Sequence, residues 1–286
     1  MKSTNNYISI LSIGLTLFFF SCATESKKTG DQQSEEKEEV DLTTEDNKTN
    51  ISSSSEAIYE SGNLRVYPAY IAKRFPNAKL MLDAPKVSEV NKAGEYNFKF
   101  SVEDYELAKQ TEKADMRHCA NSKKGQHIHY ILNNSPYVAH YEPTFKGELM
   151  DGNNVVLAFL SRSYHESIKN KTAYVLKNFK VGESASDFDE TAEHLFYSRP
   201  KGTYEGEDTK KILLDFYLVN SELSSDGNKV KVNIDDKEFM LDSWSPYFVE
   251  GLSKGMHSFR IRLVDYEGNL VPGPFNDSGE REIELK

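Results

Sequence analysis

Side chains able to bind metals or move protons gather in one part of this 286-residue chain. Six of the seven histidines, and the only cysteine beyond the first 22 residues, lie between His118 and His194. Imidazole and thiol groups are the ones that ligate transition metals or exchange protons near neutral pH. The sequence therefore points to this stretch as the place where chemistry would occur.

Two of these histidines are separated by one residue, in the segment Gly125-Gln126-His127-Ile128-His129-Tyr130. Alternate residues of a β-strand point to the same face, so His127 and His129 share one face while Ile128 and Tyr130 share the other. The strand rise places the two imidazoles roughly 6–7 Å apart, a spacing that suits shared metal ligation.

A metal site needs further ligands, and three candidates lie nearby in sequence. His165 lies within Ser161–Ser167, His140 follows Pro136-Tyr137, and Cys119 lies just upstream. Nitrogen and thiolate donors favour zinc or copper over calcium or magnesium. The pattern predicts a zinc or copper site formed by His127, His129 and His165, with His140 or Cys119 as a fourth ligand.

Two other interpretations remain open for the same residues. In the first, His127 or His129 hydrogen-bonds Glu142 or Ser163 in a buried structural network. In the second, the protein is a hydrolase that uses His165, with a serine or Cys119 supplied from another strand. No Gly-x-Ser-x-Gly elbow or Gly-rich phosphate loop occurs in the chain. Non-enzymatic binding is therefore the leading expectation.

The elements that must hold these residues have the pattern of β-strands. Tyr96–Val102, Val230–Ile234 and Phe259–Val264 alternate with a period of two, as half-buried strands do. Residues that favour tight turns separate such runs, as in Asp151-Gly152-Asn153. We therefore predict an all-β fold of Ig-like antiparallel sandwiches.

Two stretches of the chain are loosely similar, which suggests a repeat. They run from His127–Ile131 to Val155–Leu160 and from Val230–Ile234 to His257–Leu263, each with a Pro-Tyr pair and a glycine turn between. We predict two Ig-like domains, at 58–198 and 207–286, joined by a segment containing Pro200 and Gly202. The first would carry the histidine site and the second would be a spacer or a partner-binding module.

The N-terminus predicts an exported protein. Lys2 precedes an apolar stretch, Ile8–Phe20, which is too short to span a bilayer and has the length of a signal-peptide core. It runs into Ser21-Cys22, which resembles a bacterial lipobox and implies that Cys22 is lipidated. We thus expect a signal peptide at 1–21 and, at 22–57, the lipidated cysteine with an acidic, disordered tether.

Charge limits the classes of partner. The net charge is −10 and the pI is near 5.3, so we expect no nucleic-acid partner, which would require a basic face. With Cys22 lipidated, Cys119 has no partner within the chain, so no disulfide framework is expected. The expected partners are the membrane, through the lipid, and a protein, peptide or glycan ligand.

The segments quoted above resemble a family of Bacteroidota exported lipoproteins. The resemblance covers roughly residues 80–182 and rests on the motifs Gly125–His129 and Phe159–Ser167. Some of these proteins are described as phosphopeptide-binding. The resemblance implies an envelope protein anchored to the outer membrane. The acidic segment after Cys22 resembles the surface-export signals of such lipoproteins, which implies that the protein is surface-exposed. It also makes five residues parts of one recurring pattern: Cys119, His127, His129, His140 and His165.

Overall fold

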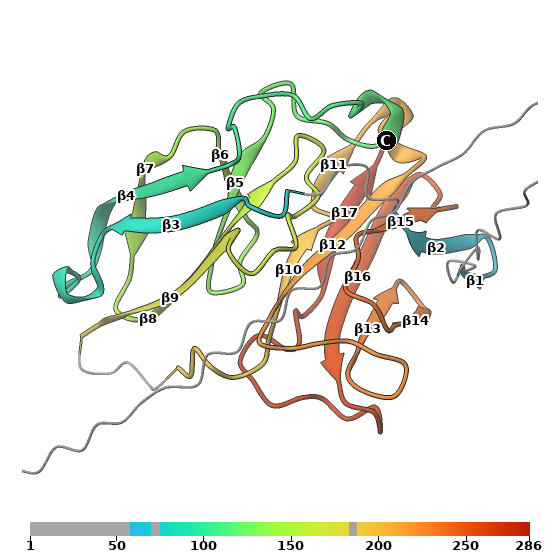
Figure 1. Ribbon diagram of the computed structural model, residues 1–286. Helices are drawn as coiled ribbons and strands as arrows, with labels where there is room; N and C mark the ends of the chain where they lie inside the picture. The colour runs from blue at the N-terminus through green and yellow to red at the C-terminus, as the bar shows by residue number, and fades with distance from the viewer. Residues whose placement is uncertain (1–57, 70–74, 183–187) are drawn as a thin grey trace, which may run out of the picture. The chain divides into compact units, whose positions relative to one another are not determined.

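The computed structural model describes residues 58–69, 75–182 and 188–286 (Figure 1). The predicted signal peptide, the Cys22 lipidation site and the whole tether lie outside the described residues and stay predictions. Within the described ranges, no helix is long and apolar enough to cross a membrane. The helices found there are short 3₁₀ turns: η1 (Val87–Glu89), η2 (Asp115–Arg117) and η3 (Gly206–Thr209).

A first sandwich is built from seven consecutive strands. One sheet has the order β3-β4-β7 and the other β6-β5-β8-β9, and neighbouring strands in both are antiparallel. The strands are β3 (Lys79–Ala84), β4 (Gly94–Glu103), β5 (His127–Leu132), β6 (Val138–His140), β7 (Thr144–Leu149), β8 (Gly152–Ser161) and β9 (Tyr174–Val181). Their inward-facing apolar residues, including Phe98, Ile128 and Phe179, form one core.

A second sandwich pairs the sheets β1-β2-β15-β12-β10 and β11-β17-β16-β13-β14. Its strands are β1 (Tyr59–Ser61), β2 (Leu64–Pro68), β10 (His194–Arg199), β11 (Gly202–Tyr204), β12 (Ile212–Val219), β13 (Lys229–Ile234), β14 (Lys237–Leu241), β15 (Tyr247–Glu250), β16 (Gly255–Val264) and β17 (Arg281–Leu285). Only the β11–β17 pair is parallel among the paired strands described. Phe216, Val232 and Ile261 lie in its core.

Both sandwiches have the Ig-like strand order. In the first, the first, second and fifth strands form one sheet, and the third, sixth and seventh lie together in the other. In the constant-type Ig arrangement the fourth strand lies in the sheet of the first, second and fifth strands. Here the fourth strand, β6, instead pairs with β5 in the other sheet. The core of the second sandwich repeats this order, with β10, β12 and β15 facing β13, β14, β16 and β17. The predicted all-β, Ig-like fold is confirmed.

The loose sequence repeat corresponds to equivalent strands. Within the seven strands that make up each Ig-like core, β5 and β13 are the third strands, and β8 and β16 are the sixth. Each sixth strand begins with a glycine at positive φ, Gly152 at 102° and Gly255 at 129°. The two Pro-Tyr pairs are not equivalent, because Tyr137 precedes β6 and Tyr247 begins β15.

The sheets divide the chain differently from the predicted boundary. The strands β1 and β2 and all but the last residue of β10 were placed at 58–198 by the sequence, yet they pair with strands of the second sandwich. Val66 of β2 lies in that sandwich's core. The segment with Pro200 and Gly202 is not a joint between domains. It is the point where the chain passes from β10 in one sheet to β11 in the other, and turn-forming residues suit either role.

The two sandwiches share an apolar contact. The outward faces of β5 and β8 carry Ile131, Leu157 and Phe159, which cluster with Phe196 of β10 and Tyr217 of β12. Figure 1 shows β8 and β9 beside β10 and β12. All β5 residues except Leu132 are consequently buried. A strand buried on both faces places even its polar side chains inside the protein, and this positions the histidines.

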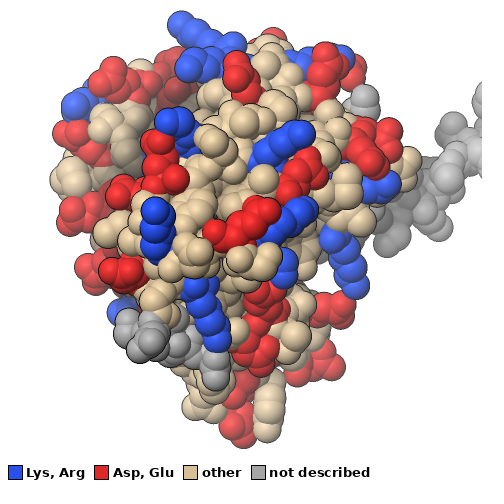
Figure 2. All heavy atoms as spheres, turned by 90° about the vertical axis from the view of Figure 1, so that its left-hand side faces the viewer, with Lys and Arg blue, Asp and Glu red and all other residues tan. Residues whose placement is uncertain are grey.

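Charges are mixed on the face that Figure 2 shows. Lysine and arginine side chains alternate with aspartate and glutamate, and no continuous basic patch covers this face.

Candidate functional site

Strand β5 aims two imidazoles at the second sandwich. Ile128 and Tyr130 point into the first core, so the alternation of the strand turns His127 and His129 the other way. Both histidines are fully buried. The Nδ1 of His129 lies 3.2 Å from the Ser198 hydroxyl of β10. The histidine pair predicted from sequence therefore lies where the two sandwiches meet.

Gly125 prepares the entry into β5. Its φ is +91°, and its carbonyl oxygen lies 2.8 Å from the His127 Nδ1. A Cβ at this position would lie 2.7 Å from backbone atoms of Ala108 and Lys109. Only glycine fits both the backbone conformation and the space.

We expect Gly125→Ala to lower the free energy of unfolding by about 1–3 kcal/mol, because the backbone of either segment must shift. Urea denaturation measures this. Gly152→Ala is the matched control, since Gly152 also has positive φ, +102°, but nothing within 4 Å of the added carbon. A loss no larger than that of the control would show that close packing at Gly125 is unimportant.

His165 comes from the loop between β8 and β9, which is held by a buried ion pair. Arg162 Nε donates to Glu166 Oε1 at 2.9 Å, and the Tyr164 hydroxyl donates to Glu166 Oε2 at 2.9 Å. Arg162 and Glu166 are each about 2% exposed. His165 has a φ of +72° and is the only residue of Ser161–Ser167 that is not fully buried. The loop is a packed structure that presents one imidazole.

Asp215 of β12 ties this loop to the second sandwich. Its carboxylate accepts hydrogen bonds from the Ser167 amide at 3.0 Å and the Ser167 hydroxyl at 3.1 Å. Lys169 Nζ lies 2.5 Å from the same carboxylate. Asp215 is fully buried and Lys169 nearly so. The position of His165 thus depends on a charge in the other sandwich.

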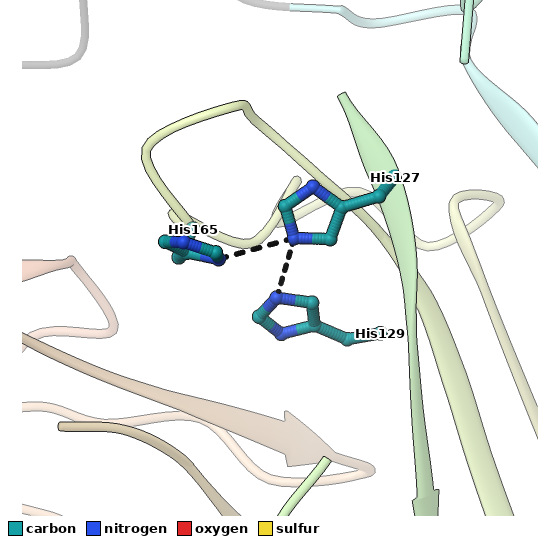
Figure 3. A group of neighbouring side chains, drawn as sticks. All are labelled: His127, His129 and His165. Atoms are coloured by element: carbon teal, nitrogen blue, oxygen red, sulfur yellow. Dashed lines mark hydrogen bonds between the residues drawn. The ribbon is translucent and has the colours of Figure 1, made fainter. Parts of the chain in front are cut away.

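The three histidines converge on one point (Figure 3). The Nε2 atoms of His127 and His129 are 2.9 Å apart, and His127 Nε2 is 3.1 Å from His165 Nδ1. One ring nitrogen from each histidine can be chosen so that all three lie within 4.8 Å of one another. Among the described residues, these three histidines form the group that is spaced closely enough to hold a metal ion. The predicted three-histidine set is brought together.

Proton positions at this cluster follow from its acceptors. A carbonyl oxygen only accepts, so His127 Nδ1 carries the hydrogen given to Gly125, and the Nε2 of a neutral His127 is a bare lone pair. His129 Nε2 and His165 Nδ1 both face that lone pair. The single lone pair of His127 Nε2 can accept a good hydrogen bond from only one of these two nitrogens. The Tyr137 hydroxyl lies 3.2 Å from His165 Nδ1 and can donate to it, in which case His165 Nδ1 carries no hydrogen for His127. Hydrogen bonds alone leave one nitrogen–nitrogen contact poorly satisfied.

The surroundings keep these rings neutral. Burial lowers the pKa of His127 to about 4 and lowers the pKa of His129 and His165 well below 6.5. The positive charge of Arg199 lowers all three pKa values further. Neutral imidazole is the form that ligates a metal.

His140 and Cys119 do not join the cluster. His140 is the cross-strand partner of Ile128, so it shares the face opposite to His127 and stacks on Phe145 with ring centres 3.3 Å apart. Cys119 lies in an apolar cluster with Tyr164 and others, where burial raises the pKa of its thiol to about 12. The prediction that either would be the fourth ligand does not fit these positions.

The other interpretations can be compared with the same contacts. Glu142 and Ser163 do not partner His127 or His129, since Ser163 instead exchanges hydrogen bonds with Thr111. No described serine hydroxyl or cysteine thiol hydrogen-bonds to His165, whose partners are His127 and Tyr137. The hydrolase arrangement therefore has no nucleophile at this ring.

Sequence reasoning missed four residues of the site: Tyr137, Ser198, Arg199 and Asp215. Asp215 had a usable signal, because it is a lone charge within the apolar run Ile212–Val219. A charge in a buried strand needs a partner and so marks a functional or structural contact. Tyr137, whose ring stacks on His129 with centres 3.6 Å apart, had no such signal.

Comparisons with known proteins find no matching family model and no matching curated protein. Similar solved structures include fibronectin(III)-like modules of Clostridium thermocellum CbhA, with 11% identity, 72% of this chain and 92% of that chain covered, and a TM-score of 0.23. Bacteroides ovatus SGBP-B in complex with a mixed-linkage heptasaccharide has 9% identity, coverages of 73% and 48%, and a TM-score of 0.20. Domains 4 and 5 of the S-layer protein SbsC have 9% identity, coverages of 74% and 99%, and a TM-score of 0.20. The Ig-like assignment rests on the strand order above.

Proposed function

We propose that this protein is a lipid-anchored envelope protein that acts as a non-enzymatic binding module and binds zinc or copper at His127, His129 and His165. The observation that carries the proposal is the convergence of three imidazole nitrogens, with the outer nitrogens of two rings already held. His127 Nδ1 is held by the Gly125 carbonyl and His129 Nδ1 by the Ser198 hydroxyl. Such outer hydrogen bonds orient metal-ligating histidines.

A metal ion would satisfy the nitrogen–nitrogen contact that hydrogen bonds alone leave poorly satisfied. All three inner nitrogens would present lone pairs, while His129 would donate its remaining hydrogen to Ser198. Tetrahedral zinc with bonds of about 2.0–2.1 Å holds its nitrogen ligands about 3.3–3.4 Å apart. Two nitrogen–nitrogen distances here are 2.9 and 3.1 Å. Small side-chain movements would open the cluster to that size, leaving a fourth position for water or an external ligand.

The test is metal content and metal-induced stabilisation of the chain purified without a His tag. We expect about one zinc or copper per chain, and stabilisation of the metal-free form by about 2.7 kcal/mol at a hundredfold excess of metal over Kd. Joint replacement of His127 and His129 by alanine should abolish both effects.

Matched single variants separate ligation from folding. His165→Asn should fold, because asparagine tolerates the positive φ of this position, and should bind metal far more weakly. His140→Asn, on the opposite face of the sheet, should bind normally. Absence of bound metal in the wild type, or equal stabilisation of the His127/His129 double variant, would overturn the metal site.

A second candidate is a structural or ligand-recognition lipoprotein in which the same histidines form a hydrogen-bonded network. The contact between His129 and Ser198 joins the sandwiches, and the nearby charge of Arg199 disfavours a second cation. This candidate expects His129→Ala to lower stability by about 1–3 kcal/mol with or without metal. A melting curve that chelator shifts downward would favour the metal site instead.

A further inference from the structure

We propose that Arg199 and Lys201 form a binding site for a small oxyanion, a carboxylate or phosphate group, beside the histidine cluster. The site does not depend on the metal and is formed by the turn that connects β10 to β11.

Arg199 is a buried cation without an anionic partner. Its side chain is only 6% exposed, and no carboxylate among the described residues forms an ion pair with it. Its Nη1 donates to the Tyr204 hydroxyl at 3.2 Å, while its buried Nε has no acceptor. Asp215 is its cross-strand neighbour, but that carboxylate is committed to Ser167 and Lys169. An unpaired buried guanidinium is costly, and an anion would remove the cost.

The groups around Arg199 do not supply the missing negative charge. Its guanidinium carbon lies 5.7 Å from the ring centres of both Tyr137 and Tyr204. These aromatic faces offset the charge only in part. Burial raises the pKa of the Tyr137 hydroxyl and of the Cys119 thiol to about 12, so both stay protonated near neutral pH.

Lys201 adds a second cation without a described ion pair, which lies over the same Tyr137 ring as Arg199. Its Nζ lies 4.1 Å from the Tyr137 ring centre and donates to the Tyr137 carbonyl at 2.6 Å, but it forms no described ion pair. Lys201 lines a cavity of about 550 Å³ together with Ser198 and Arg281. The buried Nε of Arg281 also lacks an acceptor. Glu280 and Glu282 line the same cavity, which favours a small anion over an extended acidic chain.

A planar or tetrahedral oxyanion suits this arrangement. Guanidinium groups bind carboxylate and phosphate through parallel N–H donors, and such charge-assisted bonds are the strong ones. An anion at Arg199 would also offset the positive potential that now reaches all three histidine rings. The oxyanion site would thereby favour a cation at the neighbouring cluster.

The experiment is calorimetric titration of the full, chelator-treated chain with inorganic phosphate and with acetate, at constant pH and ionic strength, with chloride as the reference anion. We expect saturable binding of phosphate, acetate or both, and none of chloride. Phosphate alone would identify a phosphorylated ligand, and acetate alone a carboxylate ligand. Lys201→Met should weaken binding about tenfold, the equivalent of one charge-assisted hydrogen bond, and Arg199→Met should abolish it.

Arg260→Met is the control, because Arg260 is a half-exposed arginine of the same sandwich that already pairs with Asp277. It should bind the anion as the wild type does. If Arg199→Met fails to fold, the half-buried Lys201 variant decides. Phosphate and acetate behaving like chloride, or full binding by Lys201→Met, would overturn the oxyanion site. Because metal is removed, either result leaves the zinc or copper proposal standing.

Discussion

Replacing Asp215 with alanine is expected to lower the free energy of unfolding by about 3–5 kcal/mol, because it breaks a buried ion pair and leaves Lys169 uncompensated. The change also removes the acceptors of the Ser167 amide and hydroxyl. The loop that carries His165 would lose its attachment to the second sandwich. We therefore expect metal affinity to fall with stability, measured by urea denaturation and by metal titration of the folded fraction.

Glu103→Ala is the control for this prediction. Glu103 also forms an ion pair with a lysine, Lys79, but about half of each side chain is exposed. Removing an exposed pair should cost less than about 1 kcal/mol. Equal losses for the two variants would mean that burial of Asp215 has no special energetic consequence.

Stability should fall steeply as the pH is lowered from about 6.5 toward 4. The pKa of His127 is about 6.5 in the unfolded chain and about 4 in the folded protein. The unfolded state therefore binds more protons in this window, and the stabilisation is complete above pH 6.5 and is lost as pH falls through 4. A difference of this size corresponds to roughly 3 kcal/mol for His127 alone. The pKa values of His129 and His165, lowered in the same direction, add to the effect.

Urea denaturation of the chelator-treated chain between pH 7.5 and 4 measures this dependence. Carboxylates also titrate near the lower end, so the informative quantity is the difference between variants. His127→Gln should flatten the dependence, because one buried titrating ring is gone, whereas replacement of the exposed His118 by glutamine should leave it unchanged. Identical slopes for the wild type and His127→Gln would contradict a neutral, buried His127.

Local pattern by itself determined the strands and the faces of their side chains. The alternation in Gly125–Tyr130 places His127 and His129 together whatever the remainder of the chain does, because successive strand residues point to opposite faces. Period-two runs and glycine turns likewise predicted an Ig-like all-β fold, and the matched third and sixth strands explain why the repeat was visible. These features depend on neighbours within a few residues.

The tertiary structure decided which face was buried and what completed the site. His140 lies close to His127 in sequence, but its antiparallel pairing with Ile128 turns it to the opposite face. Ser198 and Arg199 reach the cluster only because the second sandwich packs on β5 and β8, and Asp215 of that sandwich ties down the loop that carries His165. Strand register and packing between sandwiches depend on contacts between residues far apart in the chain, and a single sequence does not encode those contacts in its local periodicity.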